Sequence, residues 1–224
     1  MGYNSYSFSF SVQEKFKETQ EPNRDLELLK VAPLRSKKIF QYLYKRGIPK
    51  AIAQKYLCLV QYQNKKRPRE GGYYAFAQKN KSEGYELRAA TDQNKFRSAL
   101  IKKDITVHRG RVGEGVCVFE GMLDHLSMLA ILDNECLNND VIILNGASLY
   151  ERAKEHILEK GYSKIDLFLD NDETGDKVTA KFIEAFGSHA ADHRHTYEDY
   201  KDLNEALRNG EPPSFAPPSP KQDP

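Results

Sequence analysis

Short apolar runs alternate with longer amphipathic segments between residues 116 and 186. The runs are VCVF (116–119), VIIL (141–144) and IDLFL (165–169), and each is followed by a segment of helical length. This alternation is typical of a parallel sheet with helices on its faces. We predict strands at 116–120, 141–145 and 164–169, helices at 122–134, 148–160 and 175–186, and then a weaker strand near 189–196 and a short helix at 203–209.

The pattern upstream of residue 110 is different and predicts a small α+β unit. Ser36 is a plausible N-cap for a helix that ends at Gly47, and Pro49 suits the first turn of a second helix that extends to about Leu57. A strand at 59–62 and a hairpin with arms at 72–77 and 84–88 complete the unit. The first helix is predicted to place four residues on its apolar face: Ile39, Phe40, Leu43 and Tyr44.

Charge divides the chain in the same place as the hydrophobic pattern. Residues 1–115 contain 24 Lys and Arg against 11 Asp and Glu, a net charge of +13, and residues 116–224 contain 10 against 21, a net charge of −11. The basic half could neutralise a polyanion while the acidic half holds metal. The alternative is that two solvated surfaces of opposite sign attract each other. We predict a linker or arm at 1–23, a basic unit at 24–112, an α/β unit at 113–210 and a disordered Pro-rich tail at 211–224.

Several classes of protein are disfavoured by composition. No apolar run approaches the roughly 18 residues of a membrane span, so we expect a cytoplasmic protein without membrane partners. The three cysteines, Cys58, Cys117 and Cys136, are widely spaced and form no CxxC pair. They indicate reduced thiols, and no zinc is expected in this chain.

Acidic residues follow the first and third predicted strands of the α/β unit. Glu120 ends the first strand, and Asp170 and Asp172 follow the third. Because ligands of such sheets bind beyond the carboxyl ends of the strands, these carboxylates could converge on a divalent cation. Mg²⁺ or Mn²⁺ suits oxygen ligands that are shared with a substrate phosphate. Asp124 and Asp202 are further candidate ligands. The alternative is that the carboxylates cap helices, since Asp172 directly precedes one.

Two other motifs overlap DNDETG (170–175) and are rejected. A calcium loop requires a bidentate Glu at its twelfth position, where this chain has Lys181. The hydrophobic strand followed by DxDxT also fits aspartyl-nucleophile phosphatases. That family places its motif on the first strand with the core following, whereas here only 54 residues follow Asp170.

VFEG (118–121), a second strand and then LFLDNDETG (167–175) together resemble the Toprim domain of topoisomerases, DnaG-type primases and related nucleases. The resemblance implies a mostly parallel α/β sheet flanked by helices, preceded here by the smaller basic α+β subdomain. It implies that Glu120, Asp170 and Asp172 are catalytic and bind metal. Asp124 matches an acidic position of the primase branch, and YKDLNE (200–205) resembles a late primase element in which Asp202 is a further ligand. Asn204 departs from that element, where many members have aspartate, and this puts a second or third metal site in doubt.

The resemblance extends to the basic unit. RGIP (46–49), GGYYAFAQKNKSEGYELR (71–88) and the stretch through LIKKDI (100–105) are similar to the region preceding Toprim in primases of Bacteroides-type mobile elements. It implies a DNA primase core that synthesises RNA primers on a single-stranded DNA template from ribonucleoside triphosphates, with a replicative helicase as a partner. The family's N-terminal zinc-binding module is absent, so we expect a fragment. The implied template- or nucleotide-binding residues are Arg88, Arg97, Lys102 and Lys103, and the alternative for each is a solvated surface charge.

Two rival functions share these residues. A Toprim nuclease would use the same metal cluster to cut phosphodiesters but needs no basic nucleotide-loading unit. A non-catalytic remnant of a primase would bind nucleic acid only. A topoisomerase is disfavoured, because it needs a catalytic tyrosine in a large separate domain for which this chain has no room.

Overall fold

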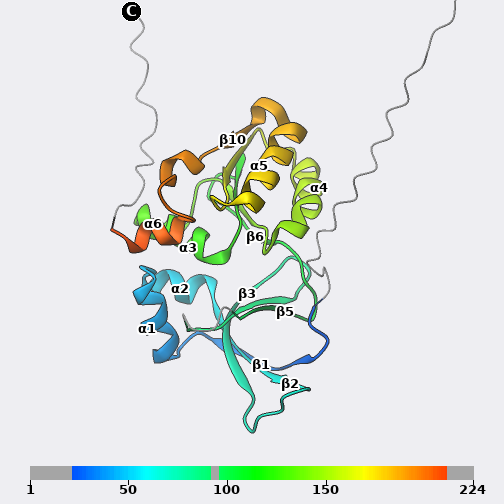
Figure 1. Ribbon diagram of the computed structural model, residues 1–224, viewed down its shortest axis with the longest axis vertical. Helices are drawn as coiled ribbons and strands as arrows, with labels where there is room; N and C mark the ends of the chain where they lie inside the picture. Colours follow the sequence, from blue (N-terminus) through cyan, green and yellow to red (C-terminus); the bar gives the residue numbers. More distant parts are fainter. Residues whose placement is uncertain (1–21, 92–95, 211–224) are drawn as a thin grey trace, which may run out of the picture.

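The computed structural model describes residues 22–91 and 96–210, which contain two five-stranded sheets. The unit with the second sheet lies above the unit with the first in Figure 1. The predicted arm at 1–23 lies almost wholly outside the described residues, and the predicted tail at 211–224 does so entirely. Among the residues that are described, no helix has both the length and the apolar character needed to cross a membrane.

The first sheet is an antiparallel meander with strand order β1-β2-β3-β4-β5. A helical hairpin of α1 (Lys37–Lys45) and α2 (Lys50–Tyr56) connects the first two strands. The hydroxyl of Ser36 accepts a hydrogen bond from the amide of Ile39, so it caps α1 as its sequence predicts. The strands are β1 (Leu26–Pro33), β2 (Cys58–Asn64), β3 (Tyr73–Lys79), β4 (Tyr85–Arg88) and β5 (Arg97–Leu100).

The second sheet has the order β10-β9-β7-β8-β6. Its first four strands are parallel, and β6 joins the edge antiparallel to β8. The strands are β6 (Thr106–His108), β7 (Gly115–Phe119), β8 (Asp140–Ile143), β9 (Lys164–Phe168) and β10 (Ala190–Asp192). The α-helices are α3 (Met122–Ile131), α4 (Tyr150–Lys160), α5 (Glu173–Phe186) and α6 (Leu203–Arg208), and short 3₁₀ turns lie at Ala147–Leu149, Gly187–His189 and Arg194–Tyr197.

The central strands of this sheet are buried on both faces, which explains their continuous apolar runs. In β7, Val116 and Val118 pack on the side of α4 and α5, whereas Cys117 and Phe119 pack on the side of α3 and α6. Successive side chains of a strand point to opposite faces. This alternation also decides on which side of the sheet each carboxylate beyond a strand end will lie.

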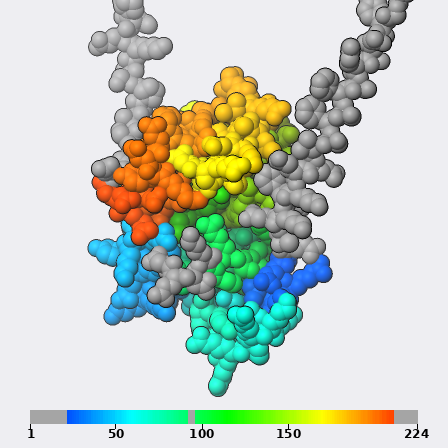
Figure 2. Space-filling model, viewed as in Figure 1, coloured from blue at the N-terminus to red at the C-terminus, as the bar shows by residue number. Residues whose placement is uncertain are grey.

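One hydrophobic core extends through both units. It joins Ile39 and Leu43 of α1 and Phe76 of β3 to Phe119 of β7 and Leu203 of α6. The space-filling view shows the surface of the helical hairpin against the last helix (Figure 2). The basic unit and the α/β unit are therefore packed as one body, with the hairpin serving as part of the helical layer beneath the second sheet.

Asn204 closes the contact between α6 and the hairpin. Its side-chain amide donates to the carbonyl of Arg46 and to Ser127 Oγ, both at 2.9 Å, and its oxygen accepts from the Arg46 guanidinium at 3.0 Å. The residue is 2% exposed. Asn204, the position where the sequence departs from the primase element, is thus a structural clamp.

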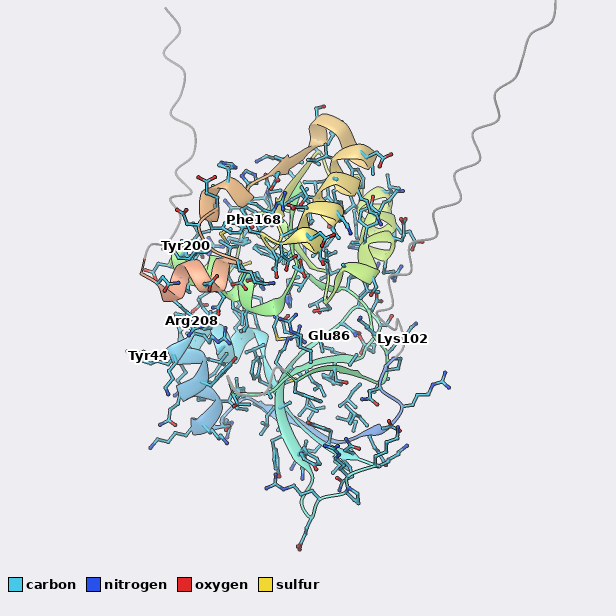
Figure 3. The ribbon with its side chains drawn as sticks, viewed as in Figure 1. Tyr44, Glu86, Lys102, Phe168, Tyr200 and Arg208 are labelled. Carbon is cyan, nitrogen blue, oxygen red and sulfur yellow. The ribbon has the colours of Figure 1, made fainter. Side chains whose placement is uncertain are left out.

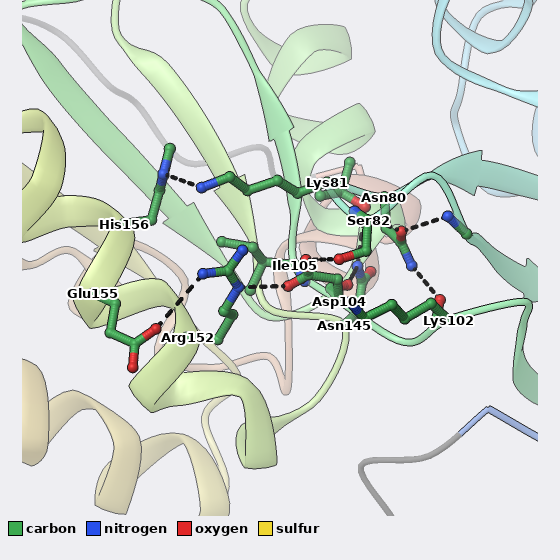
Figure 4. A network of polar contacts seen from close by, with 12 residues as sticks. Asn80, Lys81, Ser82, Lys102, Asp104, Ile105, Asn145, Arg152, Glu155 and His156 are labelled. Atoms are coloured by element: carbon green, nitrogen blue, oxygen red, sulfur yellow. Dashed lines mark hydrogen bonds and ion pairs between the residues drawn. The ribbon is translucent and has the colours of Figure 1, made fainter.

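A polar network fixes the other side of the junction (Figure 4). The Asp104 carboxylate accepts hydrogen bonds from Ser82 at 2.5 Å and from Arg152 of α4 at 3.1 Å. Asn145, which follows β8 with a φ of 56°, donates to the carbonyl of Asp104 at 2.9 Å. Because these groups come from both units, they hold the turn between β3 and β4 against the strand ends of the second sheet.

The predicted fold class is confirmed: a mostly parallel sheet flanked by helices follows a smaller α+β unit. Three strands were missed, namely β1, β5 and β6. β6 pairs with β8 although it precedes residue 113, where the α/β unit was predicted to begin. Tyr44 was predicted to share a face of α1 with Ile39, Phe40 and Leu43, but it is 81% exposed, whereas Ile39 and Leu43 are buried.

We expect Asn204→Asp to lower the free energy of unfolding by about 1–3 kcal/mol, because a carboxylate cannot donate to the Arg46 carbonyl or to Ser127 Oγ. The Ser127 hydroxyl already donates to Leu123, so it cannot reverse its role without losing that bond. Urea denaturation measures the change. Asn209→Asp is the matched control, since Asn209 is exposed and bonds only within its own helix end, to Glu205. Equal stability of the two variants would show that Asn204 is no clamp.

Candidate metal centre

Three aspartates from separate parts of the chain meet at the carboxyl ends of β7 and β9. One carboxylate oxygen of each of Asp124, Asp170 and Asp202 lies within 4.8 Å of the others. Asp124 and Asp170 are buried, and Asp202 is half-buried. They belong to the first turn of α3, the end of β9 and the N-cap of α6.

Strand alternation explains this grouping. Phe168 packs on the α3 side of the sheet and Leu169 on the α5 side, so Asp170 returns to the α3 side. There it meets Asp124 of α3 and Asp202 of α6. Asp124 and Asp202, which the sequence offered only as further candidate ligands, are thus the two residues that cluster with Asp170.

Glu120 lies beside this cluster and within its electric field. Burial, together with the charges of Asp170 and Asp172, raises the pKa of Glu120 to about 7, even though the Asp170 amide and Lys201 favour its charged form. The backbone of Glu120 is also fixed, since its carbonyl accepts a hydrogen bond from the backbone N–H of Asn145 at 3.1 Å. The sequence-predicted trio of Glu120, Asp170 and Asp172 is therefore gathered at one rim of the sheet.

Asp172 has a different role in this structure from that of Asp170. Its Oδ1 accepts the amides of Thr174 and Gly175 at 3.0 and 3.1 Å, so it caps α5. Its Oδ2 accepts from Lys201 Nζ at 2.5 Å. Burial alone would raise the pKa of Asp172, but the hydrogen bonds from Lys201 and from these amides hold it below its usual value. Asp172 is thus a helix cap, and so is Asp202, whose Oδ1 accepts the Glu205 amide at 2.7 Å; for Asp202 this cap is compatible with its place in the cluster.

The buried aspartates carry the cost of their mutual repulsion. Burial, and then the charge of Asp202, raises the pKa of Asp170 to about 6. The pKa of Asp124 is also raised, first by burial and then by Asp202, Asp170 and Glu120. Such a cluster is costly unless a cation neutralises it. Lys201 supplies one such charge, at 3.5 Å from Asp170.

The donor set fits a hard divalent metal ion. All the donors are carboxylate oxygens, the ligands that such ions prefer. Neighbouring ligand oxygens of an octahedral Mg²⁺ are about 3.0 Å apart and opposite ones about 4.2 Å, so the three oxygens, which lie within 4.8 Å of one another, would draw closer together to share one ion. Asp124, Asp170 and Asp202 could hold the ion, and Glu120 and Asp172 carry further carboxylates next to Asp170.

Two residues that the sequence did not single out brace this rim. The side-chain amide of Asn171 donates to the carbonyls of Tyr197 and Tyr200, both at 2.9 Å. Its backbone N–H donates to the Lys201 carbonyl at 2.6 Å. These bonds hold the segment before α6 beside the end of β9. Gly175 lets α5 begin against the same strand end, since a Cβ there would lie 1.9 Å from the Asp170 carbonyl oxygen. Their only sequence signal is their position inside and just after the DxD motif.

The four predicted basic residues lie in or just after the first sheet. Arg88 and Arg97 are cross-strand neighbours, and Lys102 and Lys103 follow β5. Burial, and then the charge of Arg97, lowers the pKa of Arg88 to about 10, while Glu86 and Asp124 favour its charged form. Arg88 therefore lies within range of the negative charge of Asp124. Lys102 is exposed (Figure 3), and Lys103 donates to Ser148 at 3.5 Å.

Comparison with known families identifies the class of domain that this geometry belongs to. Residues 117–207, which contain all five candidate ligands, match the family described as Toprim-like. The second half of the chain is thus a Toprim-like domain. Residues 28–97 match a family described as "Domain of unknown function (DUF8464)". No curated protein matches the chain.

Solved structures share the fold of both units. The chain is similar to the primase fragment of the bacteriophage T7 primase-helicase protein, with a TM-score of 0.57 and 21% identity over 75% of this chain and 69% of that one. It is also similar to one chain in the structure of a complex, described as the bacteriophage T7 lagging-strand DNA polymerase interacting with primase domains of two gp4 subunits bound to an RNA/DNA hybrid and dTTP. That match has a TM-score of 0.50 and 21% identity, over 81% of this chain and 86% of that one. The resemblance to a Toprim-domain primase is confirmed at the level of the fold.

We expect Asp170→Asn to stabilise the metal-free protein, and more strongly at pH 8 than at pH 5. The raised pKa values mean that the folded state binds more protons than the unfolded chain between about pH 4 and pH 7. The carboxylates therefore reduce stability progressively as the pH rises through that window. Each kcal/mol corresponds to about 2–4 °C in the melting temperature of a domain of this size.

Thermal melts in EDTA measure the effect. His108, whose pKa burial lowers to about 4, titrates in the same range with the opposite slope, so the quantity to follow is the difference between variant and wild type. Adding Mg²⁺ at pH 8 should raise the melting temperature of the wild type and leave Asp170→Asn unchanged. A difference that is constant with pH would contradict the repulsion described here.

We expect Gly175→Ala to lower the free energy of unfolding by more than about 3 kcal/mol and to remove stabilisation by Mg²⁺. The new methyl group would meet the Asp170 carbonyl oxygen at 1.9 Å and its amide nitrogen at 3.2 Å, so α5 and the strand end must separate. Glu173→Ala is the control in the same turn, since it removes only an exposed ion pair with Lys177. A Gly175→Ala protein that melts like the control would refute the tight contact.

Proposed function

We propose that this chain is the catalytic core of a DNA primase, which synthesises RNA primers on a single-stranded DNA template. The observation that carries the proposal is the carboxylate cluster of a Toprim-like domain packed against a basic unit within one body. The basic unit favours nucleotide polymerisation over phosphodiester cleavage, because polymerisation must hold a template and a triphosphate near the metal. Both T7 structures that share the fold are described as containing primase domains or fragments.

Each group at the rim has a task in this proposal. Mg²⁺ or Mn²⁺, when bound, would offset the charge that develops on phosphorus and on the leaving pyrophosphate. Asp124, Asp170 and Asp202 would hold it, and Glu120 and Asp172 are the further candidate ligands. The alternative role of Glu120 is that of a general acid or base instead of a metal ligand, and its raised pKa in the metal-free protein suits that role.

The basic residues would bind the polyanionic partners. Arg88 lies within range of the charge of Asp124 and thus near the metal centre. From there its guanidinium would bind the phosphates of an incoming ribonucleotide. Arg97, Lys102 and Lys103 extend the positive charge away from the metal centre along β5 and the loop that follows it. A replicative helicase as a partner, a cytoplasmic location and an origin in a mobile element stay predictions.

The proposal is tested with single-stranded template, ribonucleoside triphosphates and Mg²⁺ or Mn²⁺. We expect new short RNA oligomers and an intact template. Asp170→Asn and Asp124→Asn should reduce synthesis by at least the 10–100-fold that loss of an outer-shell partner of a metal typically costs. Asp133→Asn is the control, because Asp133 is exposed at the end of α3 and outside the cluster.

The same reaction separates the rival functions. Template cleavage that depends on Asp170 would indicate the nuclease. Binding of template with neither product would indicate the non-catalytic remnant. Oligomers that persist in Asp170→Asn would remove the cluster from the reaction and refute the proposed site.

A further inference from the structure

A groove of about 1200 Å³ lies between the helical hairpin and the segment after β4, where Ala90 and Thr91 follow Arg88. Five basic side chains line it, and no acidic residue is among those that do. Three aromatic side chains, Phe40, Tyr42 and Tyr44, lie between them on α1. The basic residues are Arg35, Lys37, Lys38, Lys45 and Lys50.

The positive charge of the groove is not balanced locally. Residues 28–69 contain 12 Lys and Arg and no Asp or Glu. Elsewhere in this stretch, Lys55 and Lys66 reach carboxylates of other segments, Glu135 and Asp25. Within the part of the chain that the structure describes, no carboxylate forms an ion pair with the side chains of Arg35, Lys37, Lys38 or Lys45. The described residues thus leave the positive charge of these four side chains without a partner carboxylate, as suits a site for a polyanion.

The aromatic residues select among polyanions. Tyr44 stands at the outer edge of α1 (Figure 3) with 81% of its surface exposed, one helical turn beyond Phe40 on the same face. Lys50 Nζ lies 5.4 Å from the centre of the Phe40 ring. Of the three rings, Tyr44 is the exposed one, and an exposed aromatic ring among basic side chains is the arrangement that stacks an unpaired base and binds the phosphates beside it. A base within a duplex is already stacked and cannot use such a ring.

The groove leads toward the metal centre. The Tyr42 ring, in its wall, packs against Phe76 at 5.9 Å between centroids and lies near enough to Arg88 to favour that residue's charged form. The negative charge of Asp124 in turn favours the charged form of Arg88. At the C-terminal end of α1, Arg46 is bonded to Asn204, two residues from Asp202. A strand lying in the groove would thus be guided to the carboxylate cluster.

We propose that this groove binds single-stranded DNA, with a base stacked on Tyr44 and phosphates on the surrounding lysines. As the path of the template it rests on the proposed primase function, but as a binding site it stands on the groove alone. It adds a second nucleic-acid contact, on the hairpin, to the one assigned to Arg88, Arg97, Lys102 and Lys103.

The test is fluorescence anisotropy with a labelled oligothymidylate in EDTA, so that no catalysis contributes. Tyr44→Ala should weaken binding about 5- to 100-fold, and Tyr44→Phe should retain it. The double variant Lys37→Gln/Lys38→Gln should reduce the slope of log K against log salt by about 1.4, which corresponds to two phosphate contacts on a single strand. Tyr74→Ala is the matched control, an exposed tyrosine on β3 outside the groove, and should bind like the wild type.

Several outcomes would overturn the proposal. These are Tyr44→Ala binding as tightly as the wild type, absence of oligonucleotide binding by the wild type, and equal loss of single-stranded and duplex binding in Tyr44→Ala. Displacement of the oligonucleotide by stoichiometric ribonucleoside triphosphate would make the groove a nucleotide site instead, and displacement by an acidic peptide alone would make it a protein-docking site. Failure of primer synthesis with Tyr44-dependent binding intact would refute the proposed function and leave the groove standing.

Discussion

Repulsion among carboxylates at the ends of two parallel strands is the constraint around which this molecule is arranged. Asp124, Asp170 and Asp202 come within 4.8 Å of one another, with Glu120 beside them, in a place where burial raises the cost of every negative charge. Nothing in the local sequence favours that arrangement. The carboxylates are held together by strand alternation, by helix caps and by hydrogen bonds between the end of β9 and the segment before α6. The stability of the surrounding fold thus offsets the destabilising repulsion within the site.

The two units depend on each other for the same reason. The helical hairpin of the basic unit is part of the core beneath the second sheet, and Arg46 is bonded to Asn204 in the first turn of α6. The helix that carries Asp202 is thus positioned by a residue from the other unit. On the opposite side, Asp104 and Asn145 connect the β3–β4 turn to the strand end beside Glu120. The basic surface and the acidic rim therefore keep a fixed distance.

How far the sequence predicts this structure differs between its parts. The apolar runs at 116–119, 141–144 and 165–169 predict β7, β8 and β9 because strands buried on both faces must be apolar throughout. β1 is largely exposed and contains a register shift between Leu28 and Lys30, and β6 has three residues, so neither leaves a periodic signal. All five carboxylates could be named in advance, but their grouping could not. Whether Asp170 meets Asp124 and Asp202 depends on which face its strand presents, and the capping role of Asp172 depends on where α5 begins. Periodicity places Tyr44 on the apolar side of its helix, but it does not show how much of that side a short helix buries.

The position of Asp202 along the chain has a consequence for biosynthesis. The first of the three clustered aspartates, Asp124, and the third, Asp202, are separated by three strands and two α-helices, and α6 is the final helix of the described residues. A nascent chain that has left the ribosome only as far as α5 can pair β7, β8 and β9 but has no third aspartate and no clamp onto the hairpin. Its cation site is unfinished, however well the sheet has formed, and is completed only when α6 emerges and docks.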